Sequence, residues 1–227
     1  MDRKQRLYVW IAGVFVSALI AGDLIGGKFF RVAGLDLSVG MIPFPLTFVL
    51  TDIVNEFYGT EGARRITFLG LGMAIFVFTV INVALALPVS PESPMSQEVF
   101  ARAFGWSSRL YVASLVAYVV GQLLDIWIFQ LFLRITGHRF LWLRATGSTV
   151  FSQAIDTLVV NFVLLSGKRP VEFILTVARN GYVVKLLIAV GMTPLIYLGR
   201  GLFLRYLEPA AIGLGGAGAA STSTADG

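Results

Sequence analysis

Long apolar runs, rather than alternating polar and apolar positions, dominate this chain up to residue 206. A helix needs about 20 mostly apolar residues to cross a bilayer. Six segments approach that length, and they are predicted at 7–26, 39–58, 66–87, 110–133, 147–165 and 182–204. The expected fold is therefore an all-α integral membrane protein with about six transmembrane helices.

The segments between these runs carry loop signals. Residues 27–38 are expected to form a short loop, and the prolines at 88–94 mark a second one, followed by a surface helix at 98–104. Residues 171–179 fit either an interfacial helix or the beginning of the last span, in which Pro194 predicts a kink. Residues 1–206 are read as one membrane domain. Residues 207–227, mainly Gly, Ala, Ser and Thr, are expected to be a disordered tail.

Composition agrees with a membrane protein and excludes several classes of site. Charged residues make up 14% of the chain and hydrophobic residues 56%, whereas a soluble domain is about one quarter charged. The chain has no cysteine and one histidine, His138. Disulfides, thiolate sites and histidine-cluster metal sites are therefore excluded within one chain. No nucleotide-binding or metal-enzyme motif is present, so neither a metal, a cofactor nor an enzymatic activity is expected.

The net charge of +5 arises from basic residues in short loops, which is a membrane pattern and not a nucleic-acid site. With the amino terminus inside, ten basic residues fall on the inner side and six on the outer side. The ten are Arg3, Lys4, Arg6, Arg64, Arg65, Arg134, Arg139, Arg144, Arg200 and Arg205; the six are Lys28, Arg31, Arg102, Arg109, Lys168 and Arg169. This imbalance predicts that both termini lie in the cytoplasm.

Four carboxylates interrupt the predicted spans: Asp52, Glu56, Asp125 and Asp156. Each costs about 2.5–3.5 kcal/mol at the centre of a bilayer. We therefore expect these acids to face one another, a cation or a polar solute in a cavity between helices. A solute transporter explains such groups better than a passive membrane anchor does.

The polar residues of the second span share one helical face. Asp52 and Glu56 are four residues apart, and Asn55 lies on the same side. Because neighbouring carboxylates repel in a low dielectric, one of the two acids is expected to be protonated or paired. The alternative interpretation of Glu56 is a solvated group at the interface. Phe44 and Phe48, two turns and one turn before Asp52, either form the floor for a planar ligand or simply pack.

The fourth and fifth spans repeat a short pattern. Gln122 precedes Asp125 by three residues, and Gln153 precedes Asp156 in the same way. This match suggests a weak internal repeat, and many transporters place their sites between repeats. The alternative is hydrogen bonding that joins membrane helices. Lys185 is the natural counter-charge for an aspartate, or it extends to the membrane surface. Asp23, near a helix end, is read as a solvated charge.

Residues 44–59, which read FPLTFVLTDIVNEFYG, resemble the signature of the queuosine precursor transporters, a vitamin-uptake-transporter-like family of bacterial inner membranes. Residues 63–65, 114–125, 148–157 and 185–197 are similar to the same family, so the resemblance covers about 7–204. Val160 and Asn161 depart from the more aromatic run expected there, and the surroundings of Asp23 match loosely.

The resemblance implies uptake of 7-cyano-7-deazaguanine, 7-aminomethyl-7-deazaguanine or a related deazapurine. The residues expected to bind it between helices are Phe44, Phe48, Asp52, Asn55, Glu56, Gln122, Asp125, Gln153, Asp156 and Lys185. The family also looks like the substrate-binding subunits of energy-coupling-factor transporters. The chain is thus expected to act alone, as a homo-oligomer or with an energising partner. An ion or proton channel, a transporter of another vitamin-like solute and a structural membrane protein are the alternatives.

Overall fold

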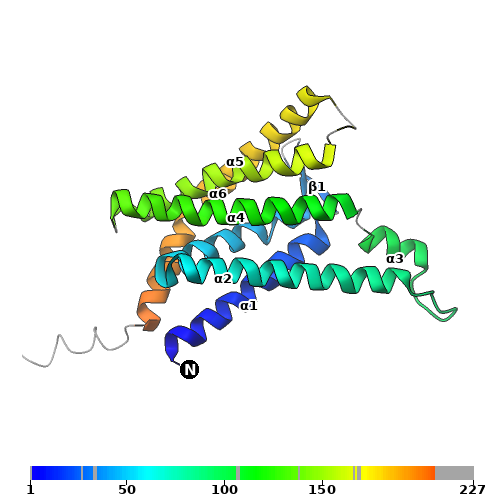
Figure 1. Ribbon diagram of the computed structural model, residues 1–227, viewed down its shortest axis with the longest axis horizontal. Coiled ribbons are helices and arrows are strands. Elements are labelled where there is room, and N and C mark those ends of the chain that lie inside the picture. Colours follow the sequence, from blue (N-terminus) through cyan, green and yellow to red (C-terminus); the bar gives the residue numbers. More distant parts are fainter. Residues whose placement is uncertain are drawn as a thin grey trace, which may run out of the picture.

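The computed structural model describes residues 2–26, 28–32, 35–105, 108–137, 139–165, 167 and 170–207. It is a bundle of long helices with one small hairpin of strands (Figure 1). The elements are α1 (Arg3–Ile25), β1 (Phe29–Val32), β2 (Leu35–Ser38), the short 3-10 helix η1 (Val39–Met41), α2 (Phe44–Ala86), α3 (Gln97–Phe104), α4 (Ser108–Thr136), α5 (Leu141–Leu165) and α6 (Val171–Leu207). The predicted disordered tail, residues 207–227, lies outside the described residues except for Leu207, which is the last residue of α6.

Helix α2 is two antiparallel arms joined at Gly59. This residue has φ 68° and ψ −173°, a backbone conformation that glycine adopts readily and other residues rarely do. The first arm, 44–58, runs against α1: Pro43, just before it, packs at Gly22, and the Tyr58 hydroxyl donates to the carbonyl of Lys4.

The second arm, 60–86, then runs in the direction of α1. The Tyr8 hydroxyl donates to the Gly62 carbonyl, and Gly70 lies against Phe15 further along. The second and third predicted spans are therefore the two arms of α2. Counted in this way, the bundle contains the six long helical segments that the sequence predicts.

Both ends of the described chain meet at one end of the bundle, which we call the Gly59 end (Figure 1). The Phe203 ring of α6 stacks on Phe57 with centroids 3.9 Å apart, and Tyr58 packs against Tyr8 of α1. The β1–β2 hairpin and α3 lie at the opposite end. The chain runs along the bundle an even number of times, and its two described ends therefore lie at the same end.

Local sequence explains where several elements begin. Asp2 and Gln5 form reciprocal hydrogen bonds that cap α1, with 2.6 Å from the Gln5 amide to Asp2 Oδ1. Ser96 caps α3 by accepting from the Val99 amide at 3.3 Å. The surface helix predicted at 98–104 is thus present and begins one residue earlier.

The interior and exterior of the bundle both suit a membrane. Phe15, Ile66 and Phe129 are fully buried between helices, whereas Trp10 and Leu187 are more than two-thirds exposed. Within the described residues, four helical stretches are long and apolar enough to span a membrane: Arg3–Ile25, Val39–Ala86, Ser114–Thr136 and Val171–Tyr206. The prediction of an all-helical membrane protein is confirmed.

Two boundaries differ from the prediction, and one alternative that the sequence left open is resolved. Residues expected to form only a loop after α1 pair as antiparallel β1 and β2, with Phe30 opposite Leu37. Residues 171–179 form the first turns of α6, so the segment belongs to the last helix. Helix α5 begins at Leu141 and not near Gly147, because Arg144 has a buried partner inside the bundle and does not need to remain in a loop.

Candidate functional site

A cavity of about 600 Å³ lies between α1, the first arm of α2, α4, α5 and α6. It approaches the β1–β2 end, where Gly26, Ser38 and Gly40 border it. Its polar wall consists of Asp23, Ser38, Thr47, Ser114, Tyr118, Gln122, Gln153, Asp156 and Lys185. This volume is in the usual range for a small-molecule site, and a polar wall inside an apolar bundle suits a polar solute.

An ion pair joins α5 to α6 at the cavity wall. Lys185 Nζ lies 2.6 Å from Asp156 Oδ2, and the two side chains are 20% and 14% exposed. Lys185 therefore pairs with a neighbouring helix and does not extend to the surface. Because neither side chain is completely covered, both charges can be reached from the cavity.

Two phenyl rings stand beside this ion pair. Phe44 and Phe48, one turn apart on α2, meet edge to face with centroids 4.7 Å apart. The Lys185 ammonium lies 5.0 Å from the centroid of Phe44, within the range of a cation–π contact. The rings thus form an apolar surface next to a charged pair.

Two glutamines face the cavity from adjacent helices. Gln122 of α4 and Gln153 of α5 are each only 4% exposed. The Oε1 atom of each has no hydrogen-bond partner in the described part of the chain. A buried amide without a partner is costly, so these two acceptors are suited to a ligand that carries N–H groups.

Asp52 and Asp125 lie behind the cavity wall. Asp52 borders a small void of about 20 Å³, which it shares with Phe44, Gln153 and Lys185. Asp125 is fully buried, and its Oδ1 accepts from Ser152 Oγ at 3.0 Å. Neither acid lines the larger cavity.

Asn55 and Glu56 lie toward the Gly59 end and do not border the cavity. Asn55 accepts from Gln130 Nε2 at 2.6 Å, which links α2 to α4. Glu56 forms a 2.7 Å ion pair with Arg144 Nη2, with side chains 7% and 0% exposed. The alternative that Glu56 is a solvated interfacial group is therefore wrong in this structure.

Arg144 was assigned to a cytoplasmic loop by sequence, and that assignment is wrong. It is fully buried on α5, donates to the Gly137 carbonyl at 2.7 Å and lies over the Phe129 ring. The ion pair with Glu56 supplies the charge compensation that such burial requires. The sequence does contain a signal for this burial. Glu56 is an acid within a predicted span, and such an acid requires a basic partner.

The two Gln–Asp patterns have different surroundings. Gln122 and Gln153 both face the cavity, but Asp125 is buried among hydroxyl groups while Asp156 pairs with Lys185. Helices α4 and α5 pass closely at Gly121, where an added Cβ would lie 3.3 Å from that of Asp156. The repeated pattern therefore places two amides together but gives its two acids different roles.

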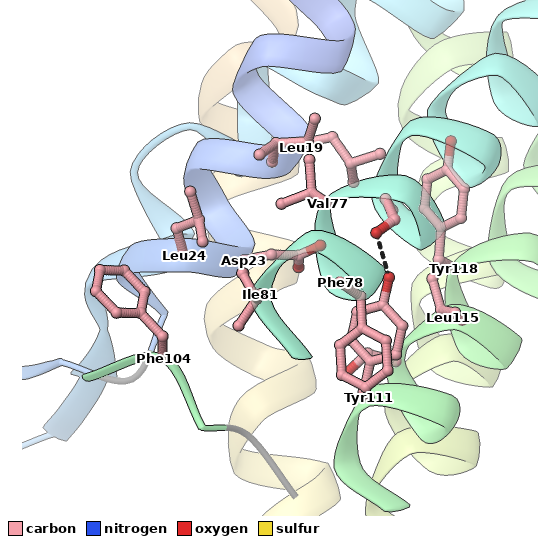
Figure 2. A pocket seen from close by; sticks show the side chains of 13 residues that line it. Leu19, Asp23, Leu24, Val77, Phe78, Ile81, Phe104, Tyr111, Leu115 and Tyr118 are labelled. Atoms are coloured by element: carbon pink, nitrogen blue, oxygen red, sulfur yellow. Dashed lines mark hydrogen bonds between the residues drawn. The ribbon is translucent and has the colours of Figure 1, made fainter. Parts of the chain in front are cut away.

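The sequence missed several wall residues. Asp23, Ser114 and Tyr118 border the main cavity and also a smaller pocket of about 80 Å³ between α1, α2 and α4. Figure 2 shows the Asp23 carboxylate directed into this pocket, with Phe104 at its edge and the Tyr111 hydroxyl donating to the backbone of the second arm. Asp23 is exposed, as its position near a helix end predicts, but its place on the wall of both hollows depends on packing between helices that the sequence does not show.

Comparisons with known proteins identify the family of this chain. A family described as "Putative vitamin uptake transporter" matches residues 38–199. A "Probable queuosine precursor transporter" of Bacillus subtilis is 31% identical over 199 residues, which cover 87% of this chain and 84% of the relative. A "Probable queuosine precursor transporter" of Haemophilus influenzae is 33% identical, covering 70% and 69%.

A "Queuosine precursor transporter" of Escherichia coli is 29% identical over 161 residues, covering 71% of this chain and 70% of the relative. No solved structure matches the chain significantly. The family and the relatives are named as transporters and not as enzymes, which agrees with the prediction for this chain. The chain belongs to the vitamin uptake transporter family.

Proposed function

We propose that this protein takes up a queuosine precursor of the deazapurine class across the bacterial inner membrane. The substrate would be 7-cyano-7-deazaguanine, 7-aminomethyl-7-deazaguanine or a close relative. The names of the three relatives support a queuosine precursor. The observation that carries the substrate class is the cavity wall, which combines an acid–lysine pair, two amides and two phenyl rings.

The edge of a guanine-like ring matches this inventory. Two neighbouring N–H donors of the ring suit a carboxylate, and the ring carbonyl suits an ammonium or an amide N–H. Asp156 and Lys185 supply these two functions at one place, and they are 2.6 Å apart without substrate. Gln122 and Gln153 supply further acceptors. The bound base would lie against Phe44 and Phe48, as bases stack on aromatic side chains elsewhere.

The proposed contact residues are therefore Phe44, Phe48, Gln122, Gln153, Asp156 and Lys185. Asp52, Asn55, Glu56 and Asp125 stand outside the cavity and would support its shape or its electrostatics. An aminomethyl substituent would carry a positive charge, for which Asp23 is a second carboxylate at the wall. We further propose that the Gly59 end, where both described termini meet, faces the cytoplasm, as the basic residues predict.

Uptake of radiolabelled 7-cyano-7-deazaguanine tests this proposal in cells that lack both its synthesis and their own transporter. Wild type should restore uptake, and Asp156→Asn should abolish it at equal membrane abundance. Glu172→Gln, which removes an exposed acid of α6, is the matched control and should transport normally. Absence of uptake by correctly inserted wild type would refute the substrate class.

A further inference from the structure

Two of the four buried acids have basic partners and two do not. Arg144 pairs with Glu56, and Lys185 pairs with Asp156. Asp52 and Asp125 form no ion pair with any described residue. Asp125 is compensated in part by Ser152 at 3.0 Å and Thr149 at 3.4 Å. Asp52 is therefore the least compensated of these four acids.

The surroundings of Asp52 disfavour its charged form. It is 2% exposed, and neither carboxylate oxygen has a hydrogen-bond partner in the described ranges. Asp125 of α4 and Glu56 of α2 are close enough to repel its negative charge. A buried carboxylate in this situation costs several kcal/mol unless it binds a proton or another cation.

Asp52 is separated from the cavity by side chains that border both spaces. The small void beside its carboxylate is bordered by Gln153 and Lys185, which also line the large cavity. Thr149 and Gln153 of α5 border the void and are neutral. Among the described residues of α6 that border it, only Lys185 is charged. The unpartnered Oε1 of Gln153 adds a second buried acceptor at this wall.

We propose that Asp52 is a proton-binding site that couples an inward proton gradient to uptake, an inference that rests on the proposed function. In the protonated state, Asp52 is neutral, and Lys185 stays with Asp156 and the substrate. Loss of the proton creates an anion that competes with Asp156 for Lys185, so the cavity wall rearranges. Because substrate and proton then share Lys185, each changes the affinity for the other. The site binds one proton on a carboxylate oxygen from the outer side and releases it to the inner side.

Purified protein in liposomes separates this inference from the proposed function. Counterflow, in which labelled external 7-cyano-7-deazaguanine exchanges with unlabelled internal substrate, needs no gradient and measures transport itself. Accumulation under an inward proton gradient measures coupling. Wild type should show both, a protonophore should abolish accumulation alone, and a sodium gradient should have no effect. Asp52→Asn imitates the protonated acid, so it should keep counterflow and lose accumulation, with its internal-to-external ratio falling to about one.

Each other outcome is decisive. Wild-type counterflow without proton-driven accumulation would overturn the coupling and leave the uptake function intact, and sodium-driven accumulation would replace the proton by a metal cation. Loss of counterflow in a folded Asp52→Asn protein would place Asp52 in substrate binding instead. Absence of wild-type counterflow would refute the proposed function itself.

If Asp52→Asn does not fold, the wild-type gradients decide, and Asp52→Glu should retain accumulation. Glu172→Gln should retain both activities.

Discussion

Lys185 of α6 reaches Asp156 of α5 with 2.6 Å between Nζ and Oδ2, and the same ammonium lies over the ring of Phe44. Three elements of the bundle therefore meet at one charged side chain on the cavity wall. A lysine in this position can donate to a bound solute without leaving its acid, because an ammonium has three N–H donors.

Replacing Lys185 with methionine should lower the affinity for 7-cyano-7-deazaguanine at least tenfold, or by about 1.4 kcal/mol. The variant loses the donor to the ring carbonyl and leaves Asp156 without its base. Calorimetric titration of purified protein measures the change. Arg179→Met, an exposed cation on the same helix, is the control. Unchanged affinity in Lys185→Met would remove Lys185 from the site.

The buried pair of Arg144 and Glu56 should contribute to stability. Arg144→Met leaves the Glu56 carboxylate almost completely buried without its main partner, so the free energy of unfolding should fall by about 3–5 kcal/mol. Arg65→Met breaks an exposed pair with Glu61 and should cost about 0–1 kcal/mol. Thermal unfolding in detergent compares them. Equal melting temperatures for the two variants would show that the buried pair is not needed.

Two glycines of the second α2 arm form a matched test of packing. A Cβ at Gly70 would meet the Tyr118 hydroxyl at 2.6 Å and Phe15 at 2.9 Å, whereas Gly72 has open space. Gly70→Ala should destabilise the bundle by about 1–3 kcal/mol, and Gly72→Ala should be neutral or stabilising, by up to about 1 kcal/mol. Melting temperatures in the reverse order would argue against the contact between α1, α2 and α4.

Phe44→Leu should weaken substrate binding by about 1–3 kcal/mol, the value found when a stacked base loses its aromatic partner. Phe76→Leu changes a ring that is 59% exposed on the outer surface and should bind normally. Titration with the same deazapurine measures both variants. Equal affinity would mean that Phe44 only packs against Phe48.

Apolar run length was enough to predict the helical bundle, because lipid forces the backbone to satisfy its own hydrogen bonds. The reversal at Gly59 lies inside one continuous helix, yet the predicted spans at 39–58 and 66–87 already leave a break between the two arms. The strand pair after α1 was missed, since two four-residue strands carry little periodic signal.

The site was predicted as a set of residue types and not as an arrangement. Helical spacing places Asp52 and Glu56 on one face, but only the packing of α5 against α2 supplies Arg144 to Glu56 and leaves Asp52 unpaired. Likewise, spacing pairs Gln122 with Asp125, while the crossing at Gly121 decides that Asp156 reaches the cavity. Which side chains pair between two helices depends on how the helices pack. The spacing of residues along one helix does not carry this information.

The absence of cysteine from the whole chain permits the most direct measurement, which is substrate protection of a single introduced thiol. Ser114→Cys places the thiol on the cavity wall, and Ser93→Cys places one in the exposed loop before α3. A water-soluble maleimide should label both proteins. Saturating 7-cyano-7-deazaguanine should slow labelling of Ser114→Cys at least tenfold and leave Ser93→Cys unchanged. Equal labelling of Ser114→Cys with and without substrate, in a protein that still binds it, would contradict the cavity as the binding site.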